Sequence, residues 1–153
     1  MKSNLVELSI HEMLVASQVG ILRQLEDIKA AKKSFIGEKQ DMAWQRHIEG
    51  ALSECAMAKY LNVYWNKSPW FNPDVGDVEV RATHHEDGRL IIRERDKDDT
   101  KYYLLTGING KYTVRGYMYA RDAKKPKYLT CVVAGRPPSF FVPQSDLRLD
   151  DEV

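Results

Sequence analysis

Hydrophobic residues near the start of the chain recur with a helical period. A seven-residue repeat is formed by Leu14, Ile21, Ile28 and Phe35, with Leu22 and Leu25 beside it. This spacing predicts one long amphipathic helix that ends near residues 34–37. Ser9 and Glu12 have the spacing of a capping box, which favours a helix start at that point. Such a helix either packs on its own domain or pairs with the same helix of a second copy.

A second helix is predicted from about residue 42 to residue 61. Its centre, residues 51–58, is almost wholly small or apolar, and Glu54 is the only charged residue there. Small neighbours allow another element to approach this helix closely. An irregular, packed connection follows, in which prolines exclude regular structure. It is marked by Trp65, Pro69, Trp70, Phe71 and Pro73.

From residue 77 onward the hydrophobic period changes to two, which is typical of strands. Val78, Val80 and Ala82 alternate with Asp77, Glu79, Arg81 and Thr83. Asp87-Gly88 and Asn109-Gly110 are hairpin signals, and the first predicts that the chain returns beside the strand it has just left. Further strands are predicted at residues 90–95, 102–106, 111–119 and 140–142, with a short helix at residues 120–125.

The composition indicates one globular domain. The chain has 153 residues, of which 43% are hydrophobic and 29% charged, and this length allows a sizeable core. We divide it into an N-terminal helical segment (1–40), a core (41–143) and an acidic tail (144–153). We find no internal repeat and no linker that would split it.

Targeting signals are not expected. No apolar run approaches the ~20 residues needed to cross a bilayer, and residues 1–10 lack the form of a signal peptide. The two cysteines, Cys55 and Cys131, lie far apart in apolar surroundings. They form no Cys-rich zinc site and favour a reducing cytoplasm.

The net charge of +1 does not by itself point to a nucleic-acid partner. Basic residues nevertheless gather between residues 115 and 127, where Asp122 is the one acid. This segment is either a solvated loop or a phosphate-binding surface. The candidate phosphate contacts are Arg93, Arg115, Arg121, Lys124, Lys125 and Lys127.

Three acids and one cation are candidates for chemistry on phosphodiesters. That reaction needs a metal that activates water and neutralises charge, and magnesium requires carboxylates that converge from different elements. Glu79 and Arg81 share one strand face, about 6.6 Å apart along the backbone. Asp74 precedes the strand at a point where the chain can bend toward the same spot. Glu54 needs a partner or a metal, because an isolated buried charge is costly.

The order of these residues resembles the PD-(D/E)XK nuclease superfamily, and more closely the small phage-encoded proteins assigned to it. The resembling stretches are residues 44–51 with Glu54, then 73–76, 79–83, 116–117, 135–138 and 141–143. The resemblance implies an α/β, three-layer restriction-endonuclease-like fold with a mixed central sheet flanked by helices. It also implies Mg²⁺ or Mn²⁺ held by Glu54, Asp74 and Glu79, DNA as substrate and, for a phage-encoded protein, the host cytoplasm.

The sequence departs from the family at Arg81, where the family usually has Lys. Arginine stays protonated, so it can stabilise phosphate charge but is poorly suited to accepting or donating a proton. This departure favours an alternative, a nuclease-fold module without catalysis that binds nucleic acid or a protein. A third class is a structural protein that dimerises through its N-terminal helix. Asp77 shares the Glu79 face and is an alternative to Asp74 as metal ligand.

Some nearby residues are weaker candidates. At most one of His84 and His85 faces the site, because neighbouring strand residues point in opposite directions. His47 lies two helical turns before Glu54, on a similar face. Residues 96–99 form an acidic loop that is more typical of a turn than of a second metal site.

Overall fold

The computed structural model describes residues 3–30, 42–68, 73–130, 134–135 and 137–149. Its N-terminal part consists of β1 (Leu5–Glu7), α1 (Ile10–Lys29) and α2 (Ala43–Leu61). The capping box is confirmed: the Ser9 amide donates to the Glu12 carboxylate at 2.7 Å, and the Glu12 amide donates to Ser9 Oγ at 3.1 Å. α1 ends at Lys29 with Ala30 as its C-cap, earlier than the end expected at residues 34–37. Pro69, Trp70 and Phe71 lie outside the described residues.

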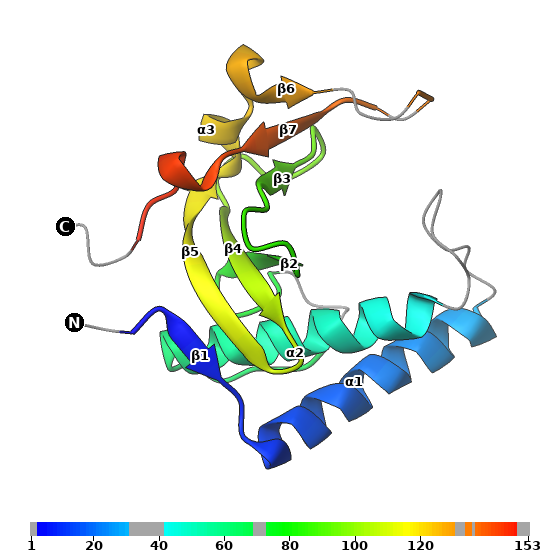
Figure 1. Ribbon diagram of the computed structural model, residues 1–153. Helices are drawn as coiled ribbons and strands as arrows, with labels where there is room; N and C mark the ends of the chain where they lie inside the picture. Colours follow the sequence, from blue (N-terminus) through cyan, green and yellow to red (C-terminus); the bar gives the residue numbers. More distant parts are fainter. Residues whose placement is uncertain (1–2, 31–41, 69–72, 131–133, 136, 150–153) are drawn as a thin grey trace.

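A mixed sheet forms the centre of the protein (Figure 1). It contains β1, β2 (Val78–Thr83), β4 (Lys101–Ile108) and β5 (Lys111–Tyr119), in the order β1-β5-β4-β2. β2 pairs with β4 in parallel, whereas the other two pairings are antiparallel. β2 therefore lies at an edge of this sheet and β4 lies inside it.

A second, smaller sheet is antiparallel and has the order β3-β7-β6. Its strands are β3 (Leu90–Ile92), β6 (Leu129–Thr130) and β7 (Ser139–Val142). The short helix α3 (Ala120–Ala123) follows β5 directly, and single turns of 3₁₀-helix occur at Pro126–Tyr128 and Gln144–Asp146. The predicted strand at residues 140–142 and the short helix from residue 120 are confirmed.

The two hairpin signals have different outcomes. Asn109-Gly110 joins β4 to β5, and both residues have positive φ (55° and 86°), as a tight hairpin turn requires. The hairpin predicted at Asp87-Gly88 is wrong: β3 pairs with β7, and β2 pairs with β4. Leu90 and Ile92 are fully buried in the core of the second sheet, and this burial outweighs local strand pairing.

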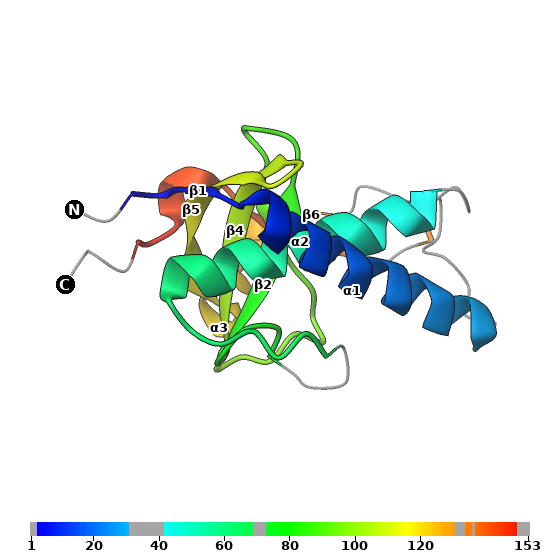
Figure 2. The same ribbon diagram turned by 90° about the horizontal axis from the view of Figure 1, so that it is seen from below.

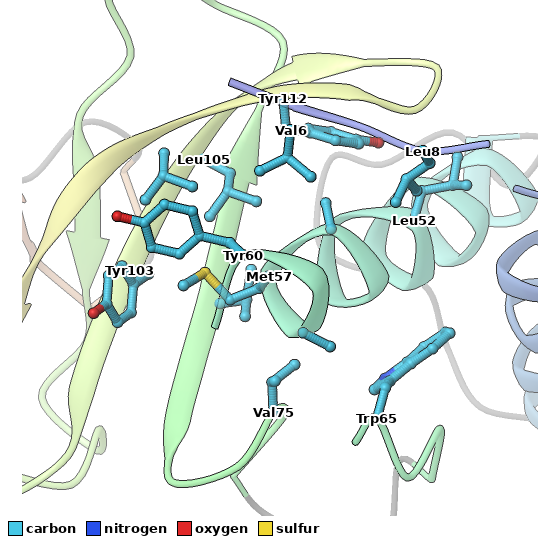
Figure 3. Packing of buried hydrophobic residues seen from close by; sticks show 14 of the residues in the cluster. Val6, Leu8, Leu52, Met57, Tyr60, Trp65, Val75, Tyr103, Leu105 and Tyr112 are labelled. Atoms are coloured by element: carbon cyan, nitrogen blue, oxygen red, sulfur yellow. The ribbon is translucent and has the colours of Figure 1, made fainter. Parts of the chain in front are cut away.

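The central sheet separates two hydrophobic cores. Along β4, Tyr103 and Leu105 belong to the core shared with α2, while Tyr102 and Leu104 belong to the core under the second sheet. Figure 3 shows the first of these cores between α2 and the sheet. The α/β class is confirmed, with the long helices on one face of the sheet. The other face carries the small second sheet and α3 in the described part of the chain.

α1 packs on α2 through two small residues and a glutamine. Ala16, Gly20 and Gln24 are buried there, and a Cβ at Gly20 would lie 2.5 Å from the Ile48 Cα. The predicted apolar stripe faces the other way, and its members within α1 are exposed: Leu14, Ile21, Leu22, Leu25 and Ile28. The prediction of an amphipathic helix is therefore correct, but among the residues that the structure describes its apolar face packs against no other element.

The helix pair extends well beyond the sheet. Figures 1 and 2 both show the C-terminal half of α1 beside the N-terminal half of α2, away from the strands. Within the described ranges, no helix has both the length and the apolar character needed to cross a bilayer.

Candidate acidic site at the sheet edge

Asp74 and Glu79 meet at the edge of β2 that no other strand of the described residues covers. The Asp74 Oδ2 accepts a hydrogen bond from the Val80 amide at 2.9 Å, which satisfies a backbone group of the edge strand. The side chains of Asp74 and Glu79 are also hydrogen-bonded to each other. Two carboxyl groups in such contact must share a proton or a cation, because two bare negative charges at this separation repel.

The electrostatic surroundings of Glu79 favour its protonated form. Partial burial, the hydrogen bond with Asp74 and the Asp74 charge together raise the pKa of Glu79 from 4.5 to about 8, although Arg81 opposes this. The pair therefore holds one proton at neutral pH. A divalent cation bound by oxygen ligands can replace such a proton, so the donor set of this pair fits Mg²⁺ or Mn²⁺.

The structure distinguishes the two aspartates that were alternatives. Asp77 is exposed, whereas Asp74 contacts both Glu79 and the β2 backbone. Asp74 is thus the aspartate beside Glu79. Its position depends on the turn before β2, where the Val75 and Val78 backbones exchange hydrogen bonds at 3.1 and 2.9 Å.

Glu54 lies on α2 and is 8% exposed. Both of its oxygens bind the Arg23 guanidinium of α1, at 2.6 and 3.1 Å. The Trp65 indole N–H adds a longer contact at 3.4 Å. Of the two alternatives expected for this buried charge, a partner or a metal, the structure shows a partner, which α1 supplies across the helix interface.

Glu54 nevertheless interacts electrostatically with one member of the acid pair, Asp74. Burial raises its pKa and the Asp74 charge raises it further, while Arg23 lowers it. Asp74 thus interacts with the charges of both Glu54 and Glu79. Within the described ranges, no three or more His, Cys, Asp or Glu residues are grouped as metal ligands.

The orientation of β2 explains this arrangement. Val78 and Val80 pack in the core shared with α2. Strand alternation directs Glu79 to the opposite face, and Asp74 contacts the backbone of the strand edge at Val80. The structure therefore forms an Asp74–Glu79 pair, with Glu54 nearby and bound to Arg23.

Arg81 is held in place by two residues, Asp96 and Tyr102. Its Nη2 donates to both oxygens of Asp96 at 3.1 Å, and its guanidinium lies 4.9 Å from the centre of the Tyr102 ring. Asp96 also accepts the Arg93 amide at 2.8 Å. The acidic loop at residues 96–99 is thus a turn that anchors Arg81. The Arg81 Nε is buried without a hydrogen-bond partner in the described part of the chain.

A cleft of about 980 Å³ lies between α2 and the end of β2. Three arginines contribute to its lining, namely Arg23, Arg46 and Arg81, and so does Glu54. Its volume is within the usual range for small-molecule sites. His84 also lines this cleft.

His47 contributes to the same cleft. Its ring nitrogen lies 3.0 Å from the Asp27 carboxylate. Burial is the largest cause of the lowered pKa of His47, and the Arg46 charge adds to it. Together these effects favour a neutral imidazole at physiological pH, bound to α1.

The predicted basic segment is partly engaged in the fold. Lys124 Nζ donates to the Asp96 carbonyl and to the Asp98 carboxylate, both at 2.6 Å. Arg115 Nε donates to Thr106 Oγ1 at 2.7 Å. The exposed members of the segment are Arg121, Lys125 and Lys127. Lys124 binds the loop at residues 96–99, and Asp96 of the same loop binds Arg81. This loop therefore fixes the position of both the basic segment and Arg81.

Sequence reasoning missed Arg23 and Asp96, the two residues that bind Glu54 and Arg81. A signal for Arg23 does exist: it lies beside Gly20 and Gln24 on the side of α1 away from the apolar stripe. A cation on the small-residue face of a helix indicates a buried acidic partner. Asp96 carried no such signal, because its contact with Arg81 depends on the path of the chain after β3.

Comparison of the chain with protein-family models, curated proteins and solved structures finds no match.

Proposed function

We propose that this protein is a metal-dependent nuclease that hydrolyses DNA phosphodiester bonds, with Asp74 and Glu79 as the ligands of Mg²⁺ or Mn²⁺. The observation that carries the proposal is the contact between these two carboxyl groups at the edge of β2, where the Val80 amide holds Asp74 in place. Two carboxyl groups in contact are suited to a divalent cation, and the arginine-lined cleft begins at the next residues of the same strand, Val80 and Arg81. The bound metal would supply an activated water and neutralise charge on the phosphate.

The other residues of the site have distinct roles in this proposal. Arg81, immobilised by Asp96, stabilises negative charge on the phosphate, and its fixed position reduces the cost of ordering it. Glu54 is not a metal ligand in this proposal, because both of its oxygens bind Arg23. The site residues follow one another in an order that resembles PD-(D/E)XK nucleases: Glu54, Asp74, Glu79 and Arg81. This order supports the same reaction and a restriction-endonuclease-like fold.

DNA contacts extend beyond the acid pair. The exposed residues Arg121, Lys125 and Lys127 neutralise phosphates, aided by Arg93, Arg115 and Lys124 where the backbone of the nucleic acid reaches them. Such contacts release counterions and give affinity without base specificity. Affinity should therefore fall steeply with salt and be nearly independent of sequence.

The test is a cleavage assay with Mg²⁺ and with Mn²⁺ on plasmid and single-stranded DNA. We expect wild type to cut and Glu79→Gln and Asp74→Asn to be inactive with an intact fold. Asp77→Asn is the matched control, because Asp77 is an exposed aspartate three residues from Asp74; it should cut like wild type. Calorimetric titration with Mn²⁺ measures binding separately from cleavage. The proposal fails if wild type binds no Mn²⁺, or if Glu79→Gln cuts as well as wild type.

A second candidate is a DNA-binding module of the same fold without catalysis. The observation that favours it is the pairing of Arg81 with Asp96 and of Arg23 with Glu54, which occupies groups that a nuclease would use on its substrate. This candidate predicts salt-sensitive DNA binding without Mn²⁺ binding or cleavage. The same two measurements therefore separate it from the nuclease.

A further inference from the structure

The outward face of α1 is an apolar surface without a partner in the described part of the chain. It is formed by Ile10, Leu14, Ile21, Leu22, Leu25 and Ile28, whose exposed fractions range from 38% to 79%. We call these residues the α1 outer face. Soluble monomers rarely expose a continuous apolar patch of this kind unless it binds something.

We propose that the α1 outer face pairs with the same face of a second copy of this chain, forming a homodimer. Leu14, Ile21 and Ile28 recur every seven residues, the period with which one helix meets an identical helix along its whole length. Gln18 is exposed in the middle of this face. A single polar residue in an apolar helix seam is a known means of setting register.

The area of the surface agrees with this occupant. At roughly 100 Å² for each side chain, the α1 outer face offers about 600 Å² per chain, so two copies bury about 1,200 Å², the lower end of stable interfaces. The opposite face of α1 is already packed on α2 through Ala16, Gly20 and Gln24. Pairing through the outer face therefore leaves the fold unchanged.

The charges of α1 favour a second copy over a lipid surface. Helices that lie on membranes carry Lys and Arg on their polar flanks. In α1, Glu12 and Asp27 contact Lys59 and His47 of α2, Arg23 is turned inward to bind Glu54, and Glu26 is the remaining acid. Lys29 is the remaining basic residue of this helix. This balance disfavours anionic bilayers and leaves apolar self-association as the dominant interaction.

Sedimentation equilibrium of the full chain tests the proposal. Wild type should have twice the 17.6 kDa chain mass. The double variant Leu14→Lys/Leu25→Lys should weaken self-association by roughly 10³-fold or more, because it removes apolar burial from both sides of the interface. Its circular dichroism should match wild type, since both residues are exposed. Tyr64→Lys, at an 80% exposed aromatic residue outside α1, is the matched control and should remain dimeric.

Two outcomes would overturn the proposal. One is a monomeric wild type. If that monomer also sediments with phosphatidylcholine–phosphatidylserine vesicles, the α1 outer face binds lipid instead of a second copy. The other is a double variant that keeps the wild-type dimer mass. Neither result depends on metal binding or DNA cleavage, so this experiment tests the dimer independently of the proposed nuclease activity.

Discussion

The pair formed by Arg23 and Glu54 joins α1 to α2, and its removal has a calculable effect on stability. In Arg23→Met the aliphatic stem stays, but Glu54 becomes a buried charge with Asp74 nearby. Both side chains of the pair are only 11% exposed. Removing one partner of a pair buried to this degree costs about 3–5 kcal/mol. For a chain of this length, that corresponds to a fall in Tm of about 10 °C.

Urea unfolding of four proteins measures this coupling: wild type, Arg23→Met, Glu54→Gln and the double variant. The double variant should be more stable than the sum of the single effects implies, because it leaves no uncompensated charge. Arg89→Met is the matched control at an exposed arginine, and should change stability by less than about 0.5 kcal/mol.

The pH dependence provides a second measurement on the same proteins. Burial already raises the pKa of Glu54, and Arg23 opposes this. Without Arg23, the native state holds the Glu54 proton to higher pH than the unfolded chain does. The cost of Arg23→Met should therefore be smaller at pH 5 than at pH 9. A cost below about 1 kcal/mol at every pH, with additive single effects, would mean that the pair behaves as a surface ion pair.

Two further predictions concern the acid site. The native state holds the Glu79 proton up to about pH 8, whereas the unfolded chain loses it near 4.5; the free energy of unfolding should therefore fall as pH rises through that window. Glu79→Gln should remove this fall and be more stable than wild type at pH 8, and equal pH profiles in urea unfolding would contradict the assignment. Arg81→Ala should lower cleavage by ~10²-fold or more, and Arg81→Lys should retain part of the activity because its charge survives. Equal rates for wild type and both variants would exclude a catalytic role for Arg81.

Much of the local structure follows from short stretches of sequence. The capping box at Ser9, the helix over residues 43–61 and the turn at Asn109-Gly110 all appear where the sequence predicts them. Each depends on contacts within a few residues: a side chain that binds a nearby amide, a run of small helix-forming residues, or two residues that tolerate positive φ. Such features need no knowledge of the rest of the fold.

The identity of the candidate acids was also accessible from sequence, but their partners were not. Glu54, Asp74 and Glu79 stand out by residue type and position. Their pairing depends on which face of β2 meets α2 and on the path of the turn before that strand. The sequence favoured Asp74 and left Asp77 as an alternative, whereas the contact of Asp74 with the Val80 amide could be located only in the structure.

The tertiary structure alone decided the long-range pairings. β2 pairs in parallel with β4 rather than with the next strand, because Leu90 and Ile92 gain full burial under the second sheet. α1 packs through Gly20 because a glycine permits close approach to α2, and this packing turns the apolar stripe outward. The energy of each choice depends on atoms far apart in sequence. A local pattern can therefore specify a helix or a strand, but not the surface against which it packs.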